Sequence, residues 1–263
     1  MSIMRLDDVD LHYRDTGPRE APALVFANSL GTDLRLWDDL LEHLPAGLRI
    51  IRYDMRGHGL SGCPPAPYKM GTLVRDAERL LDHLRVRDCV FVGLSIGGMV
   101  AQGLAVKRLD LLRGVVLAST ASKIGTAQMW HDRIEAVARG GMSALSPGVL
   151  ERWFSPAFRG LPEFAQWRAM LERQPPEGYA GCAAAIAGCD LLAATATLRL
   201  PALVIAGDED GATPPDLVRE TAQLIPGAEF ALIRGAGHLP NVERPDAFAA
   251  RLNAFLARIA HPR

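Results

Sequence analysis

The sequence has little of what marks secreted, membrane-spanning or nucleic-acid-binding proteins. Its four cysteines form no Cys-x-x-Cys pair, and the spacing of His and Cys predicts no zinc site. The N-terminus lacks the apolar core of a signal peptide, and no run reaches the ~18 apolar residues of a membrane helix. The 29 basic residues nearly balance the 30 acidic ones, so no excess of positive charge favours binding to nucleic acid or to an anionic membrane. We therefore expect a reduced, cytoplasmic protein with neither partner.

What the sequence does contain is a regular alternation of strand and helix patterns. Helical patterns at 72–84, 216–225 and 245–259 follow apolar, β-rich runs. Continuous apolar strands that alternate with helices predict a parallel sheet covered on both faces, an α/β fold. The first segment, 3–17, alternates more and predicts an antiparallel edge. The strand candidates of the parallel part are 23–27, 48–54, 89–93, 114–119, 202–207 and 228–235.

One long region breaks this alternation. From 121 to 197 no strand candidate occurs, although the segment is helical in character and holds three of the four tryptophans. We therefore predict a core domain of residues 1–120 and 198–263, with a helical cap at 121–197 inserted between two strands. Prolines predict breaks between the cap helices at Pro147, Pro156, Pro162 and Pro175-Pro176.

The strongest chemical signal is Gly-Leu-Ser-Ile-Gly at 93–97, a G-x-S-x-G pattern between an apolar strand and a helix. A sharp strand–turn–helix connection needs small neighbours because the two backbones approach closely. It holds the central serine above the carboxyl edge of the sheet, beside the free N–H groups of the helix N-terminus. The pattern therefore predicts that Ser95 is a nucleophile, and a structural glycine-rich turn is the alternative.

A serine nucleophile needs a histidine base. His58 and His238 both lie in glycine-containing loops that follow strands. The chain order Ser, Asp, His that suits this arrangement favours His238 as the base. His58 precedes the serine and is expected to shape its own loop. The other five histidines are expected to be surface or local residues: His12, His43, His83, His131 and His261.

The base in turn needs a carboxylate that orients it. The loop after strand candidate 202–207 offers Asp208, Glu209 and Asp210. Asp210 lies farthest into the loop, where it can curl toward a histidine on the neighbouring loop, so we predict Asp210 as the orienting acid and Asp208 as the second choice. All three could instead be solvated loop residues.

Two backbone N–H groups should hold the oxyanion that forms on the attacked carbonyl. One is expected from Ile96, the residue after the nucleophile. The other is expected from the polar cluster Asn28-Ser29-Leu30-Gly31, which ends the first parallel strand candidate. We predict Leu30 as this second donor, with Ser29 as the alternative.

Taken together, these motifs resemble the α/β-hydrolase superfamily along the whole chain, and several stretches resemble the 3-oxoadipate enol-lactonases within it. They are "NSLGTDLRLWD", "RYDMRGHGLS", "GLSIGGMVAQGLA", "STASKIG" and "PPEGYAGCAAAIAGCDL". The resemblance implies a mostly parallel eight-stranded sheet with a cap after the sixth strand. It also implies a serine hydrolase of bacterial aromatic catabolism, the β-ketoadipate pathway, which opens a small enol-lactone without a metal or organic cofactor.

The lactone implied by this resemblance carries an acetate arm, which calls for a cation near the nucleophile. Arg133 and Lys123 in the cap are the candidates, with Trp130 three residues before Arg133. Trp153 and Ser29 are further candidates for contact with the substrate. The candidates within the cap could instead serve packing or the solvated surface, and Trp167 is expected to pack within the cap.

The motifs leave other functions open, because they define a superfamily and not a substrate. A general carboxylesterase, another lactonase, a C–C bond hydrolase or a perhydrolase would use the same serine. A non-catalytic small-molecule receptor on this fold is a more remote alternative, since all three candidate catalytic side chains are present.

Overall fold

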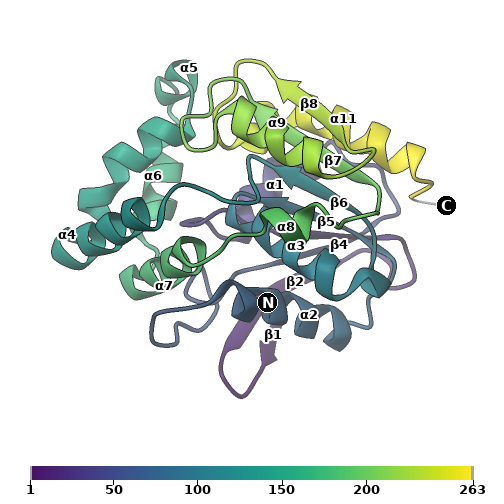
Figure 1. Ribbon diagram of the computed structural model, residues 1–263, viewed down its shortest axis with the longest axis horizontal. Helices are drawn as coiled ribbons and strands as arrows, with labels where there is room; N and C mark the ends of the chain where they lie inside the picture. The colour runs from purple at the N-terminus through teal and green to yellow at the C-terminus, as the bar shows by residue number, and fades with distance from the viewer. Residues whose placement is uncertain (1, 262–263) are drawn as a thin grey trace.

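The computed structural model describes residues 2–261, and its centre is an eight-stranded sheet in the order β1-β2-β4-β3-β5-β6-β7-β8 (Figure 1). Strands β3 to β8 run parallel, whereas β1 pairs antiparallel with β2 and β2 pairs antiparallel with β4. The strands are β1 (Ser2–Arg5), β2 (Asp10–Thr16), β3 (Ala23–Ala27), β4 (Arg49–Tyr53), β5 (Cys89–Leu94), β6 (Leu112–Ala118), β7 (Ala202–Gly207) and β8 (Glu229–Ile233).

Burial explains the two kinds of strand pattern. Every residue of β3, β5 and β7 is buried, because helices cover both faces of the sheet there, and these strands read as unbroken apolar runs. Strand β2 lies toward the edge and alternates buried with more exposed residues. All six predicted parallel strands are confirmed, and the predicted antiparallel edge consists of two strands, β1 and β2.

Two layers of helices sandwich the sheet. One layer is a continuous row in which α2 (Met70–His83), α3 (Ile96–Lys107), α8 (Leu192–Thr195) and α9 (Pro215–Leu224) each pack on the next. On the other face α1 (Asp38–Leu41) packs against α11 (Pro245–Arg258) and the short α10 (Pro240–Glu243). Among residues 2–261, no helix combines the length and the apolar character needed to cross a bilayer.

The segment 121–197 ends with α8, which packs in the row on the sheet. Its other helices lie together at the left of Figure 1: α4 (Ala127–Trp153), α5 (Pro156–Arg159), α6 (Phe164–Glu172) and α7 (Pro176–Ala187). We call these four helices the cap. Pro156 and Pro176 each begin a helix, as predicted, but the predicted break at Pro147 is wrong. Helix α4 is interrupted instead at Gly141, whose φ of 68° is a conformation that glycine adopts without strain.

The cap packs closely on the core where two glycine backbones meet. Gly57 lies in the loop after β4 with φ +73°, and Gly178 lies in the first turn of α7. A Cβ on Gly178 would lie 2.1 Å from the Gly57 carbonyl oxygen, so no larger residue fits without movement. This contact sets how near the cap can lie to the loops at the carboxyl edge of the sheet.

We expect Gly178→Ala to lower the free energy of unfolding by about 2 kcal/mol, because the new methyl group meets backbone atoms that cannot move aside alone. Gly188→Ala, just past the end of the same helix, is the matched control. Its Cβ would lie 3.6 Å from the Ala184 carbonyl oxygen, an ordinary contact. Urea unfolding of both variants makes the comparison, and equal midpoints for the two would contradict this account of the cap contact.

Candidate active site

Ser95 lies in the sharp turn between β5 and α3, with φ 57° and ψ −119°. This positive φ is strained for a residue with a side chain, and the surrounding packing holds it. A Cβ on Gly93 would lie 2.2 Å from the Gly97 carbonyl oxygen, and one on Gly97 would lie 2.3 Å from that of Ala27. The two glycines therefore let strand and helix approach closely enough to present the Ser95 side chain above the sheet.

His238 and Asp210 form a buried pair on the loops after β8 and β7. The Nδ1 of His238 lies 2.9 Å from Oδ2 of Asp210, which leaves Nε2 as the nitrogen available to a reacting group. The Asp210 carboxylate also accepts bonds from the N–H groups of Ala212 and Thr213, at 2.7 and 2.9 Å, and from Thr213 Oγ1 at 2.7 Å. These donors fix the carboxylate and, through it, the imidazole ring.

The alternative acid, Asp208, has a different contact. Its Oδ1 accepts the Gly235 N–H at 2.7 Å, so it ties the two loops together at their base.

Thr213 is a partner of the pair that sequence reasoning did not identify; its Oγ1 lies 3.2 Å from Nδ1 of His238. The "DGAT" spacing, with a hydroxyl three residues after Asp210, was the available signal, because such residues close local turns around an aspartate.

The polar cluster 28–31 is held from two sides. The Asn28 side chain donates to the Tyr53 carbonyl oxygen and accepts from Trp37 Nε1, both at 2.8 Å. The Gly31 N–H donates to Nε2 of buried His58 at 3.0 Å. His58 therefore shapes the loop on which the predicted oxyanion donor Leu30 lies, as its position before the serine indicated.

Both predicted oxyanion donors keep their N–H groups free of protein acceptors. Ile96 is the first residue of α3, and the first N–H groups of a helix have no partner inside it. Within residues 2–261, the Leu30 N–H donates to no backbone or side-chain oxygen. Two unpaired donors beside a nucleophile candidate are the arrangement that a developing oxyanion requires.

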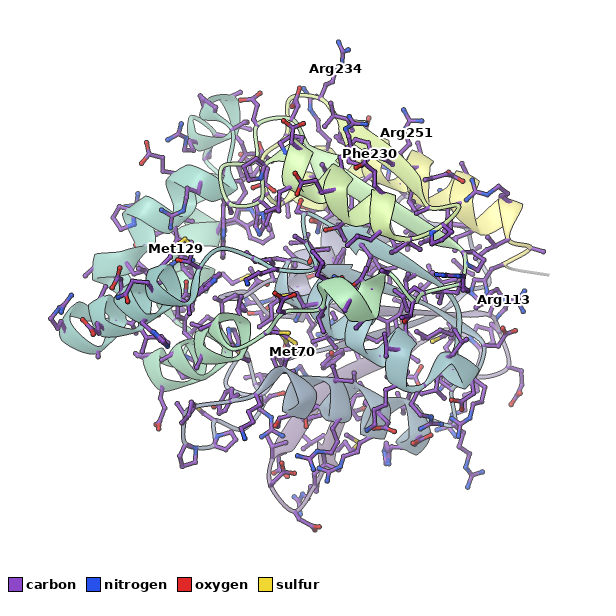
Figure 2. The ribbon with its side chains drawn as sticks, in the orientation of Figure 1. Met70, Arg113, Met129, Phe230, Arg234 and Arg251 are labelled. Atoms are coloured by element: carbon purple, nitrogen blue, oxygen red, sulfur yellow. The ribbon has the colours of Figure 1, made fainter. Side chains whose placement is uncertain are left out.

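A cavity of about 170 Å³ lies above Ser95, between the sheet and the cap. It is smaller than the ~300–1,000 Å³ of drug-sized sites, so it suits a small molecule. The lining brings together Ser95, His238 and Leu30 with most of the predicted substrate contacts, namely Ser29, Trp130, Arg133 and Trp153. Met129 also lines it and lies on the cap side in Figure 2.

Lys123 is the predicted substrate contact that does not line this cavity. Its side chain is 56% exposed, and Nζ pairs with the Asp190 carboxylate at 3.0 Å. Conversely, Arg152 and Tyr179 line the cavity although they were not predicted. They come from the end of α4 and the first turn of α7, and only the folding of both ends over the core brings them there.

The end of α4 is fastened to the loops that carry His238 and Asp210. The Gly211 N–H donates to the Arg152 carbonyl oxygen at 3.1 Å, and the His238 N–H donates to that of Trp153 at 2.8 Å. Nearby, the Glu243 carboxylate accepts from Ser155 Oγ at 2.5 Å and from the Gly237 N–H at 2.7 Å. Burial raises the pKa of Glu243. The cap wall and the candidate base therefore share one hydrogen-bonded frame.

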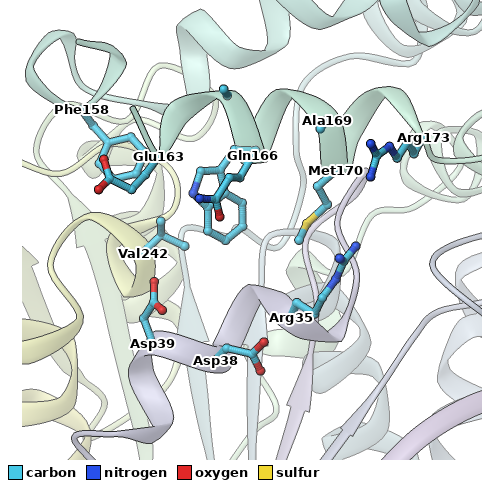
Figure 3. Close-up of a pocket in the computed structure, with 12 residues that line it drawn as sticks. Arg35, Asp38, Asp39, Phe158, Glu163, Gln166, Ala169, Met170, Arg173 and Val242 are labelled. Atoms are coloured by element: carbon cyan, nitrogen blue, oxygen red, sulfur yellow. The ribbon is translucent and has the colours of Figure 1, made fainter. Parts of the chain in front are cut away.

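A larger groove of about 830 Å³ lies elsewhere, between helix α6 and the segment 35–39 of the core (Figure 3). Charges of both signs face it: in Figure 3, Arg35 and Arg173 lie toward the right end of the groove, and Asp39 and Glu163 toward the left end. It shares no lining residue with the cavity above Ser95. By size alone this groove would be the candidate active site. The buried His238–Asp210 pair and the strained Ser95 instead indicate the smaller cavity.

The fold is a mostly parallel, eight-stranded α/β sheet with a strained turn at Ser95 after β5. Residues 24–251 match the family described as the Alpha/beta hydrolase family, and the chain belongs to it. The protein is thus an enzyme that hydrolyses ester bonds, with the fold that the sequence resemblance implied.

Similarity to named relatives extends over nearly the whole chain. It is 36% identical over 253 residues to 3-oxoadipate enol-lactonase 2 of Acinetobacter baylyi, covering 95% of this chain and 94% of that one. An enol-lactonase structure from Burkholderia xenovorans is 38% identical, with a TM-score of 0.93 and coverage of 97% and 100%. A thermophilic esterase from Thermogutta terrifontis, solved with malate bound, is 31% identical with a TM-score of 0.89, covering 96% and 94%. The predicted resemblance to enol-lactonases is confirmed.

The burial of His58, which accepts the Gly31 N–H, should make the stability of the protein depend on pH. Burial lowers the pKa of His58 from about 6.5 to about 4, so the folded protein holds this ring neutral while the unfolded chain binds a proton. The unfolded state therefore gains relative stability as pH falls from about 6.5 toward 4, by about 2.5 kcal/mol at pH ~4.5.

His58→Gln should lack this part of the pH dependence, because glutamine keeps an acceptor but does not titrate. Urea unfolding at pH ~7 and pH ~4.5 measures it. The stability advantage of the wild type over the variant should shrink or reverse at the lower pH. An advantage that stays constant across the two pH values would show that His58 is not held neutral by the fold.

Proposed function

We propose that the protein is a 3-oxoadipate enol-lactonase that opens the lactone ring to 3-oxoadipate in bacterial aromatic catabolism. The observation that carries the proposal is the cavity, in which Ser95 and His238 face Arg133 and, among residues 2–261, no aspartate or glutamate lines the wall. Such a wall favours a small substrate with its own negative charge. The similarity to enol-lactonases supports it further because it spans the cap as well as the core. A cytoplasmic location is part of the proposal.

In the first step, Nε2 of His238 accepts the Ser95 hydroxyl proton as Oγ attacks the ring carbonyl. Asp210 accepts the Nδ1–H of His238 at 2.9 Å and so stabilises the imidazolium that forms. The Leu30 and Ile96 N–H groups donate to the tetrahedral oxyanion. These donors need little rearrangement, because the turn after Ser95 and the bond from Gly31 to His58 hold both loops in place.

In the second step, the ring C–O bond breaks and the enol oxygen leaves with the electron pair, taking the proton from His238. The enol then ketonises, which removes the leaving group from the reverse reaction. Water, deprotonated by His238, attacks the acyl-enzyme ester. The Ser95 oxygen departs with the proton held by His238, and the 3-oxo dicarboxylate is released.

Arg133 is the proposed partner of the acetate arm. Its guanidinium carbon lies 4.6 Å from the centre of the Trp130 ring, and this stacking orients the guanidinium. A charge-assisted bond to a carboxylate in such a site contributes about 1.5–3 kcal/mol. Segment 121–197 would then act as a lid domain that supplies the substrate contacts while the core supplies the chemistry.

A general small-ester hydrolase is the second candidate, and the similarity to the Thermogutta esterase favours it. Both functions use the same serine, histidine and aspartate. They differ in whether the anionic arm of the substrate contributes to transition-state binding, which a comparison of substrates can measure.

Ser95→Ala should lower kcat on every substrate by ~10⁴–10⁶-fold, because the acyl-enzyme cannot form. Folding should be preserved, since alanine fits the space of serine, and circular dichroism checks this. Thr120→Ser is a control in the same neighbourhood, because its hydroxyl bond to the Ser95 carbonyl oxygen can be kept. A Ser95→Ala protein with a tenth of wild-type turnover would refute the nucleophile assignment.

The substrate itself is tested by comparing kcat/KM for the enol-lactone with that for neutral aryl acetates. The carboxylate contact should favour the lactone by at least about tenfold beyond the difference in their spontaneous hydrolysis rates. Comparable efficiency on both after this correction would replace the lactonase proposal with the general esterase.

A further inference from the structure

The cavity above Ser95 contains a second guanidinium whose presence the reaction steps do not explain. Arg152 is the last residue but one of helix α4 and lines the cavity with Arg133. Within residues 2–261, neither arginine pairs with a carboxylate. The neighbouring Glu151 is directed outward, with a side chain 72% exposed and 3.9 Å from Arg159. The cavity therefore holds two positive charges without a protein anion.

The two arginines act on each other across the cavity wall. Burial, and then the positive charge of Arg133, lower the pKa of Arg152. Tyr179 lies against both, since burial raises the pKa of its hydroxyl while the charges of Arg133 and Arg152 oppose that rise. Two like charges brought together in a partly buried space cost free energy, and a bound anion would remove that cost.

The position of Arg152 is fixed by the loop of the candidate catalytic acid. Its carbonyl oxygen accepts the Gly211 N–H at 3.1 Å, and its Cα lies 3.2 Å from where a Cβ on Gly211 would stand. The backbone of Arg152 is therefore bonded to Gly211, the residue that follows Asp210. Arg133 is oriented instead by stacking on Trp130, earlier in α4. Groups held this firmly suit the recognition of one defined anion position.

We propose that Arg152 and Arg133 form a two-guanidinium clamp on a single substrate carboxylate. The site would then select esters and lactones whose anionic arm reaches both arginines while the carbonyl lies at Ser95. The inference depends on the proposed function only in placing the reaction at Ser95. It adds a specificity-determining residue, Arg152, and narrows the substrates to small carboxylates.

The test is a double-mutant cycle with Arg133→Met, Arg152→Met and the double variant. The probes are adipate and its neutral diamide, used as competitive inhibitors of p-nitrophenyl acetate hydrolysis. Each single change should raise the Ki of adipate by about tenfold or more and leave adipamide less affected. Because both arginines hold one carboxylate, the double variant should raise the Ki of adipate by clearly less than the product of the fold-changes of the two single variants.

The control is Arg139→Met on the same helix, because Arg139 is 73% exposed and pairs with Glu135. It should retain the wild-type Ki for adipate. Thermal melting gives a second readout: Arg152→Met should melt at or above the wild type without ligand, since a repulsion is removed, and should lose the stabilisation by adipate. If Arg152→Met folds poorly, Arg152→Lys should show a smaller but measurable rise in the Ki of adipate. Lysine keeps the positive charge but lacks the paired, planar N–H donors of the guanidinium.

An unchanged Ki for adipate in Arg152→Met would overturn the proposal, and so would single-variant factors that multiply fully in the double variant. Failure of the proposed function is a separate result. Titration of adipate followed by the fluorescence of Trp130 and Trp153 measures the same cycle without turnover. A protein that binds adipate through both arginines but does not hydrolyse esters would refute the reaction and retain the clamp.

Discussion

The close packing of helix α3 against the ends of strands β3 and β5 is the constraint on which the site depends. A Cβ at Gly93 or Gly97 would collide with backbone carbonyl oxygens, at 2.2 and 2.3 Å. Because the backbones meet there, Ser95 takes a positive φ and rises above the sheet, and within residues 2–261 the N–H group of Ile96 has no acceptor. The same approach brings the polar cluster after β3 next to Ser95, so that two loops distant in sequence can serve one oxyanion.

The core could be predicted from the sequence because its signals are local. The runs at 23–27 and 202–207 match β3 and β7 residue for residue, since a strand buried on both faces must be apolar throughout. The contact between Asp210 and His238 also followed from local order, given the acid's place in its loop and the histidine's place after the next strand. The antiparallel edge of the sheet was harder to predict, because β1 and β2 are short and have few buried residues, which gives a weak sequence pattern.

The cap was less predictable because its positions depend on tertiary packing. Arg152 is one of several charged residues on α4, and nothing in its neighbours distinguishes it from Arg139, which is exposed. It reaches the cavity because Gly211 lets the end of α4 bond to the acid loop. Lys123 was a candidate beside Arg133 as a cation of the cap, yet a surface aspartate pairs with it. Similarly, Pro147 was a weaker guide to the interruption of α4 than Gly141, because the break requires a positive φ.

Catalysis as proposed depends on Ser95 being a nucleophile that the His238–Asp210 pair activates. Covalent labelling with a fluorophosphonate, followed by peptide mass spectrometry, tests it directly, because such reagents trap activated serines. We expect one adduct per chain, on Ser95, formed far more slowly in Asp210→Asn, where the orienting charge is lost. An adduct on another serine such as Ser29, or a rate of Ser95 labelling unaffected by Asp210→Asn, would contradict it.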